Sequence, residues 1–112
     1  EALKTSNFFI KYDSKGYILD INQPYLDLVG KHSEELIGKN HLELEKLMLK
    51  SESNTQQLWE ALLNGETRKD TVQFKNQEKL HTLACVYTPI VDQKGNTENI
   101  LQIALDVTDH SN

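Results

Sequence analysis

The sequence predicts a single α+β domain in which one antiparallel sheet of five strands carries short helices on one face. Two observations support this fold class: strand-like segments flank a helical middle, and two of them form a long hairpin near the C-terminal end. Strands are expected near 7–12, 17–22, 67–75, 80–91 and 97–107, with helices between 23 and 64. A chain of 112 residues is long enough to bury a core and leaves no room for a second domain.

The hairpin of 80–91 and 97–107 gives the clearest strand signal. Its first segment is rich in β-branched and aromatic residues, and Lys94-Gly95-Asn96 supplies the turn. Its second segment alternates apolar residues at odd positions with Gln102 and Asp106 at even ones. We therefore expect the odd residues of this strand to face the interior. Because Pro89 cannot donate a ladder hydrogen bond, the first strand should be irregular there.

The first half of the chain predicts a second hairpin and then short helices. Asp13-Ser14-Lys15-Gly16 separates the strands of that hairpin. Asn22 is a candidate N-cap for a helix that ends at Gly30, and a further brief helix should end at Gly38. From 40 to 50 the apolar spacing fits one or two helical turns with an irregular exit, in which Glu43 and Glu45 are expected on a solvated face.

The strongest helix signal follows at 53–65. Ser53 or Asn54 can cap it, Leu58, Trp59, Leu62 and Leu63 recur at helical spacing, and Asn64-Gly65 ends it.

Composition excludes several classes of function. The net charge is -5 and the basic residues are scattered, so no nucleic-acid surface is predicted. No apolar run approaches the 18 residues or so that a membrane helix needs, which predicts no direct membrane contact. Cys85 is the single cysteine and cannot form an internal disulfide, which fits a reducing compartment. We expect a cytoplasmic location.

Several short motifs, taken in order, resemble those of a PAS domain, or sensory box. They are Asp13-Ser14-Lys15-Gly16-Tyr17-Ile18, Asn22, Leu28-Val29-Gly30, Leu36-Ile37-Gly38-Lys39, Leu62-Leu63-Asn64-Gly65-Glu66, Thr88-Pro89-Ile90, Asp92-Gln93-Lys94-Gly95 and Leu105-Asp106-Val107-Thr108. Each motif alone is unspecific, but the order and spacing together are typical of the family. The resemblance covers nearly the whole chain and implies a strand order 2-1-5-4-3.

The resemblance implies one PAS domain over 1–112, with 1–6 as the end of an N-terminal segment and 109–112 as the start of an output linker. Such modules act in bacterial signal transduction, as parts of a sensor histidine kinase of a two-component system, a chemoreceptor or a cyclic-dinucleotide enzyme. Any catalysis would then belong to an output domain of the same polypeptide. The sequence itself contains neither a Gly-x-Ser-x-Gly elbow nor a Walker loop, and we predict no catalytic residue in it.

His41 is the one candidate metal ligand, and only if haem binds. Asn40-His41, followed by the helix with Trp59, resembles the PAS modules of bacterial chemoreceptors, in which a His at this place can hold haem iron. The last strand lacks the aromatic donor common in that subgroup. Flavin is disfavoured, because the photosensing branch carries its Cys in a helix and Cys85 lies in a strand. Haem, another small molecule and no cofactor at all remain as alternatives.

The sequence also predicts a pocket between the helices and the inner face of the hairpin. The residues expected to line it are His41, Trp59, Leu83, Cys85, Leu101, Ile103 and Leu105. Three of these residues have a structural alternative, which an ordinary filled core favours: His41 then caps or hydrogen-bonds a neighbouring backbone group, Trp59 anchors the core, and Cys85 is a small buried side chain.

A sheet covered by helices on one face needs another cover on its other face. We expect Ile100, Gln102 and Ala104 on that second face, where the N-terminal segment would pack and mediate a homodimer. Two readings of function therefore stand: a ligand-gated sensor, and a ligand-free module that dimerises and relays conformational change.

Overall fold

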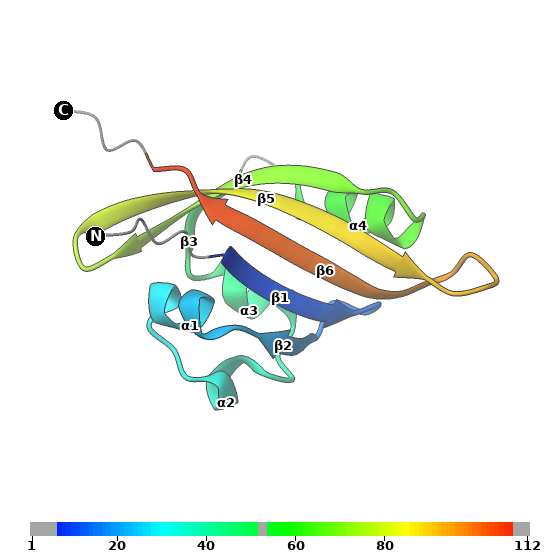
Figure 1. The fold of residues 1–112 in the computed structure, drawn as a ribbon, viewed down its shortest axis with the longest axis horizontal. Coiled ribbons are helices and arrows are strands. Elements are labelled where there is room, and N and C mark those ends of the chain that lie inside the picture. Colours follow the sequence, from blue (N-terminus) through cyan, green and yellow to red (C-terminus); the bar gives the residue numbers. More distant parts are fainter. Residues whose placement is uncertain (1–6, 52–53, 109–112) are drawn as a thin grey trace.

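The computed structural model describes residues 7–51 and 54–108, which form one antiparallel sheet with four short helices (Figure 1). The strands are β1 (Asn7–Asp13), β2 (Ile18–Ile21), β3 (Met48–Ser51), β4 (Arg68–Asn76), β5 (Lys79–Val91) and β6 (Thr97–Asp106). The helices are α1 (Gln23–Val29), α2 (Ser33–Leu36), α3 (His41–Glu45) and α4 (Thr55–Leu63). The predicted α+β class is confirmed. The segments 1–6 and 109–112, predicted as an N-terminal segment and a linker, lie outside the described residues.

The strand order across the sheet is β2-β1-β6-β5-β4-β3. The five predicted strands are present in the predicted order, and β3 is an addition at the edge, where it pairs antiparallel with β4. The sequence predicts only an irregular exit from α3 at this place, because four residues at a sheet edge carry no alternation to reveal them. The predicted irregularity near Pro89 is a shift of register between Ile90 and Val91.

Asparagine side chains begin three of the helices. Asn22 Oδ1 accepts from the Tyr25 amide at 3.3 Å, and Asn54 Oδ1 accepts from the Gln57 amide at 3.0 Å. Asn40 caps α3 in the same way. Even the longest helix, α4, has only nine residues. Within 7–51 and 54–108, no helix has the length and apolar character that crossing a bilayer requires.

The helices cover the face of β6 opposite to the predicted one. Ile100, Gln102 and Ala104 are 0%, 0% and 1% exposed. By contrast Ile103 and Leu105 are 50% and 42% exposed, and Leu101 is only partly buried. The prediction that Leu101, Ile103 and Leu105 face the interior is therefore wrong, as is the placement of the even residues on the outer face.

The reason for this error is that both faces of β6 are apolar and the outer one is the more apolar. Alternation alone points to the set richer in Leu and Ile, whereas the real interior includes the polar side chain of Gln102. On β5 the inner residues are Leu83, Cys85 and Tyr87, and Tyr87 lies opposite Gln102 in register. The inner face of the sheet thus carries polar groups at its centre.

Candidate functional site

A small cavity lies between α3, α4 and the inner face of the sheet. Its volume is about 20 Å³, and that is room for roughly one water molecule. The residues that line it are Tyr12, His41, Glu45, Met48, Thr55, Leu58, Trp59, Asp70 and Tyr87. Aromatic rings and two carboxylates therefore surround a space that the short helices leave open.

His41 is held at this cavity by the turn between β1 and β2. Its amide donates to the Gly16 carbonyl at 2.7 Å. Gly16 has a φ of +90°, and a Cβ added to it would lie 2.4 Å from His41 Cδ2. The backbone of the turn therefore packs directly on the imidazole ring, and only glycine fits there. Further along, the Ile18 amide donates to the Lys39 carbonyl at 2.8 Å, so the approach to α3 is fixed as well.

The imidazole meets two polar partners at one nitrogen. His41 Nδ1 lies 2.9 Å from Glu45 Oε2, and Trp59 Nε1 donates toward the same Nδ1 at 3.1 Å. The rings of His41 and Trp59 are 4.4 Å apart with an interplanar angle of 33°. A ring nitrogen is either a donor or an acceptor at any moment, so Nδ1 satisfies only one of these partners at a time.

Glu45 connects the two helices that border the cavity. The Thr55 hydroxyl donates to Glu45 Oε1 at 2.8 Å, which joins the first residue of α4 to the last residue of α3. The sequence predicts Glu43 and Glu45 together on a solvated face. This holds for Glu43, which pairs with Lys46 at 3.3 Å, but Glu45 turns toward His41.

Buried phenols form the sheet side of the cavity. Tyr12 and Trp59 meet edge to face, with ring centroids 5.3 Å apart. Burial, together with the nearby Cys85 and Glu45, raises the pKa of Tyr12 above its ordinary value. Burial likewise raises the pKa of Tyr87. Both side chains consequently remain neutral phenols that can donate a hydrogen bond.

Polar contacts extend from Tyr87 into the core. Gln102 Nε2 donates to the Tyr87 hydroxyl at 3.0 Å and contacts Cys85 Sγ at 3.3 Å. Within the described part of the chain, Gln102 Oε1 is buried without a hydrogen-bond partner. Burial raises the pKa of the Cys85 thiol to about 12. Cys85 is accordingly a thiol rather than a reactive thiolate.

The structure brings together only part of the predicted site. His41 and Trp59 meet at the cavity, while Leu83 and Cys85 lie on the inner face of β5 without lining it. The remaining three predicted residues, Leu101, Ile103 and Leu105, are on or toward the outer face. Sequence reasoning missed the polar and aromatic lining residues Tyr12, Glu45, Thr55, Asp70 and Tyr87. One signal was available for Glu45: it follows His41 by four residues, which places both on one face of a helix.

Haem does not fit this site. A cavity of about 20 Å³ is far smaller than a porphyrin. His41 Nδ1 is engaged by Glu45 and Trp59, and the Nε2 edge of the ring faces Gly16. In the described segments, no group of three or more His, Cys, Asp or Glu side chains is arranged to bind a metal ion.

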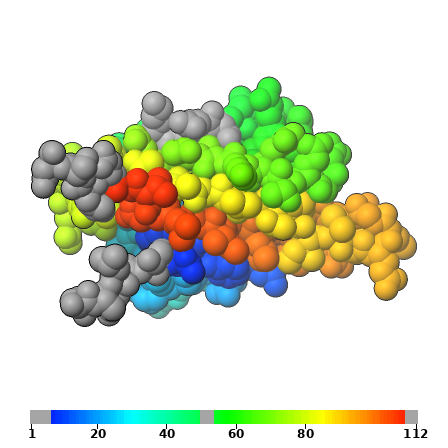
Figure 2. Space-filling view, turned by 45° about the horizontal axis from the view of Figure 1, so that its top comes forward, coloured from blue at the N-terminus to red at the C-terminus, as the bar shows by residue number. Residues whose placement is uncertain are grey.

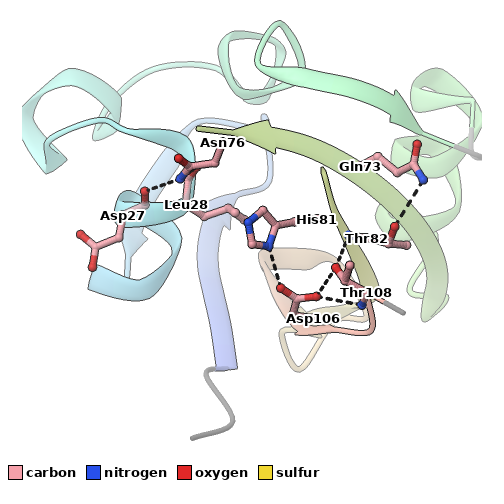
Figure 3. A network of polar contacts seen from close by, with 8 residues as sticks. All are labelled: Asp27, Leu28, Gln73, Asn76, His81, Thr82, Asp106 and Thr108. Carbon is pink, nitrogen blue, oxygen red and sulfur yellow. Dashed lines mark hydrogen bonds and ion pairs between the residues drawn. The ribbon is translucent and has the colours of Figure 1, made fainter. Parts of the chain in front are cut away.

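A second polar network fixes the end of β6 to the start of β5 (Figure 3). His81 Nδ1 lies 2.8 Å from Asp106 Oδ2, and the Thr108 hydroxyl donates to Asp106 Oδ1 at 2.5 Å. The Thr82 amide donates to Thr108 Oγ1 at 2.9 Å. We call His81, Asp106 and Thr108 the exit network, because it secures the chain where it leaves the sheet.

The surroundings of the exit network include α1. Asn76 Nδ2 donates to the carbonyls of Asp27 and Leu28 at 3.1 and 2.7 Å, so the end of β4 holds the end of α1 (Figure 3). His81 and Asp106 border an open groove beside α1 and lie apart from the cavity at His41.

The charge of Asp106 is set by opposing effects. Burial alone would raise its pKa, but the hydrogen bonds from Thr108 and His81 and the charge of His81 together outweigh it. The pKa of Asp106 is therefore lower than that of an ordinary aspartate.

An antiparallel sheet in the order described, with short helices and a small interior cavity on one face, defines a sensory domain of the PAS class. The sequence profile described as "PAS fold" matches residues 4–112, and the chain belongs to this family. The predicted family is thus confirmed. PAS domains are sensory modules of signalling proteins, usually not catalytic themselves, and they typically sit in multidomain proteins and dimerise.

Among curated proteins, the biofilm dispersion protein BdlA of Pseudomonas aeruginosa is 27% identical over 107 residues. The match covers 95% of this chain but only 26% of the length of that relative.

Solved structures share the fold. The domain of a histidine kinase from Haloarcula marismortui has a TM-score of 0.70 at 18% identity, with 93% of this chain and 91% of that chain covered. The VqmA dimer of Vibrio cholerae has a TM-score of 0.68 at 17% identity, with 93% and 47% covered. At such identities the likeness concerns the fold alone.

Replacing Gly16 by alanine should destabilise the domain more than the same change at Gly95. Both glycines have positive φ, so each alanine incurs about 1 to 2 kcal/mol of backbone strain. At Gly95 the added methyl meets open space, whereas at Gly16 it meets His41 Cδ2 at 2.4 Å. We expect Gly16→Ala to lose at least about 1 kcal/mol more in urea unfolding. Equal losses would contradict the packing of the turn on His41.

The exit network should contribute to stability in a pH-dependent way. Because the pKa of Asp106 is lowered in the folded state, its contribution is present above the ordinary aspartate pKa and is lost as the pH falls below it. Asp106→Asn should therefore cost up to about 1 kcal/mol at pH 7, since the pair is partly solvated. The difference from the wild type should shrink below about pH 4. Thermal unfolding between pH 3 and pH 7 measures both, and a difference that grows on acidification would refute the assignment.

Proposed function

We propose that this chain is the sensory module of a larger bacterial signalling protein and that it binds a small ligand in the cavity at His41. The observation that carries the proposal is the polar lining of that cavity. A core that serves packing alone is filled by apolar side chains, because buried polar groups are costly. Here His41, Glu45 and Asp70 line the interior beside the phenols of Tyr12 and Tyr87.

The same lining provides a route for a response. The cavity is bordered by α3 and α4, and Glu45 joins these helices through His41 and Thr55. A ligand that alters those hydrogen bonds would change the position of the two helices on the sheet. The output domain of the same polypeptide, in a cytoplasmic signalling protein, would receive the change through the strands that end at the exit network.

Native mass spectrometry of the purified domain tests the proposal. We expect a bound small molecule at about one per chain, released on denaturation and lost in Glu45→Gln. Glu60→Gln, an exposed change on α4 away from the cavity, is the matched control. A domain that carries no guest from any expression medium and shows no binding to a metabolite library would instead be the ligand-free relay module.

We further propose that the outer face of the sheet is covered by a second copy of the chain. Val86, Ile103 and Leu105 are exposed there, and with Ala84, Thr71 and Lys69 they border a shallow groove of about 590 Å³. In Figure 2 the strands β4, β5 and β6 lie side by side across the face turned to the viewer. Exposed apolar patches of this kind mark interaction surfaces. The predicted homodimer therefore moves to the odd residues of β6.

Ile103→Glu should weaken the homodimer, because it would place a carboxylate in an apolar interface. Sedimentation velocity on the wild type should show a dimer whose dissociation constant rises at least about tenfold in the variant. Leu19→Glu, an exposed apolar position on β2, is the control and should leave the dimer intact. A wild type that stays monomeric at high concentration, or equal effects of both changes, would contradict this surface.

A further inference from the structure

We propose that His41 is a two-state switch whose Nδ1 either accepts a hydrogen bond from Trp59 or donates one to Glu45. In the first state His41 joins α3 to α4, and in the second it bonds only within α3. The inference goes beyond the proposed function, because it holds whether or not a ligand binds. It follows from the geometry at Nδ1, from the surroundings of the second ring nitrogen and from the access of water to both partners.

The two partners make opposite demands on one ring nitrogen. Trp59 Nε1 carries a hydrogen and lies 3.1 Å from His41 Nδ1, so this contact needs a lone pair on Nδ1. Glu45 Oε2 is a carboxylate oxygen 2.9 Å from the same atom, so the second contact needs a hydrogen on Nδ1. Both distances are those of ordinary hydrogen bonds. The two bonds therefore exclude each other, and each corresponds to one tautomer of the neutral ring.

The second ring nitrogen favours neither tautomer. In many proteins a partner at one imidazole nitrogen determines which nitrogen carries the proton. His41 Nε2 faces the Gly16 turn, and among the described residues it makes no hydrogen bond. The balance between the tautomers is therefore set at Nδ1, by the competition between Trp59 and Glu45.

Each state leaves one partner to water, and water can reach both partners. The Glu45 side chain is 30% exposed, so solvent can donate to Oε2 while Nδ1 accepts from Trp59. Trp59 borders the cavity, which has room for about one water molecule. A water molecule there can accept from the indole N–H while Nδ1 donates to Glu45. Because neither state leaves a buried polar group unsatisfied, the two states lie close in free energy.

The two states differ in how α3 is joined to α4. His41 and Glu45 both belong to α3, whereas Trp59 belongs to α4. Thr55, the first residue of α4, donates to Glu45 Oε1 at 2.8 Å and leaves Oε2 free for either state. The bond between His41 and Trp59 is a second polar link between the helices, and only the first state contains it. The switch therefore makes or breaks one bond between α3 and α4.

Aromatic contacts connect the switch to the sheet. The ring centroids of His41 and Trp59 are 4.4 Å apart, and Tyr12 of β1 meets Trp59 edge to face at 5.3 Å. Tyr12 is only 2% exposed, so its ring is packed on all sides. A closely packed interior changes between discrete arrangements and does not deform continuously. An indole that leaves Nδ1 should therefore alter the packing of α4 on the sheet.

NMR of the ¹⁵N-labelled domain tests the switch in the wild type. The His41 signals are those lost in His41→Gln, and they are measured at a pH above which they no longer change, so that the ring is neutral. A ring nitrogen with a hydrogen and one without differ widely in ¹⁵N chemical shift. We expect the shift of His41 Nδ1 to lie between these two values, because both tautomers are populated and exchange rapidly. A shift at either extreme overturns the inference.

Two variants each remove one partner. Trp59→Phe removes the donor, so the shift of His41 Nδ1 should move to the value of a protonated nitrogen. Glu45→Ala removes the acceptor, so the shift should move the opposite way. Glu43→Ala, a change on the same helix at the glutamate that pairs with Lys46, is the matched control and should leave the shift unchanged. Circular dichroism shows that each variant is folded, and a folded variant that gives no shift, or the reverse shift, contradicts the switch.

The indole N–H separates a switch from a merely structural role of Glu45. Trp59 is the only tryptophan of the chain, so its Nε1–H gives one signal. If Glu45 competes for Nδ1, Glu45→Ala should slow the exchange of this hydrogen with solvent, because Nδ1 then accepts from Trp59 all the time. Faster exchange would mean that Glu45 only supports packing, and it would overturn the inference. If the switch fails while native mass spectrometry recovers a bound ligand, the sensory proposal still stands.

Discussion

The contact between the Gly16 turn and His41 fixes the geometry on which the interior depends. The turn between β1 and β2 accepts the amide of His41 and packs against its ring, which places α3 over the sheet. From there the imidazole reaches Glu45 on the same helix and Trp59 on α4. Because α3 has five residues and α4 nine, neither helix would be stable alone, and these tertiary contacts determine where both lie.

The fold was largely predictable because its signals are local. The turn at Lys94-Gly95-Asn96 predicts the β5–β6 hairpin, and asparagine caps mark the helix starts. The edge strand β3 was missed, since its pairing with β4 is a tertiary fact that four residues do not encode. The predicted inward face of β6 was wrong for a related reason. Alternation shows that a strand has two different faces, but the packing of the helices determines which face is the interior.

The site was predictable only in part, because its members come together from distant segments. His41 was identified through a family resemblance, and Trp59 through its place on an amphipathic helix. The sequence indicates only that Tyr12 and Tyr87 are aromatic residues of strands and that Glu45 belongs to a charged helix surface. The environment of each is set by the partner segment: Glu45 is turned inward by His41 and Thr55, not by its own neighbours in sequence.

The hydrogen-bonded side chains of Tyr87 and Gln102, at the centre of the sheet, connect the cavity with the strands that bear the outer apolar face and the exit network. Gln102 Oε1 is buried without a hydrogen-bond partner among the described residues, and such a group costs about 1 to 3 kcal/mol. Gln102 bonds Tyr87, which borders the cavity, so the guest site and this costly region share a residue. Tyr87 lies on β5 and Gln102 on β6, and the outer residues of these two strands form the exposed apolar face, while their ends meet in the exit network. A rearrangement that gives this buried oxygen a hydrogen-bond donor would therefore act on strands that also bear the proposed dimer surface and the exit network. The energetic cost of the polar core thus lies where a change inside the domain can alter its outer contacts.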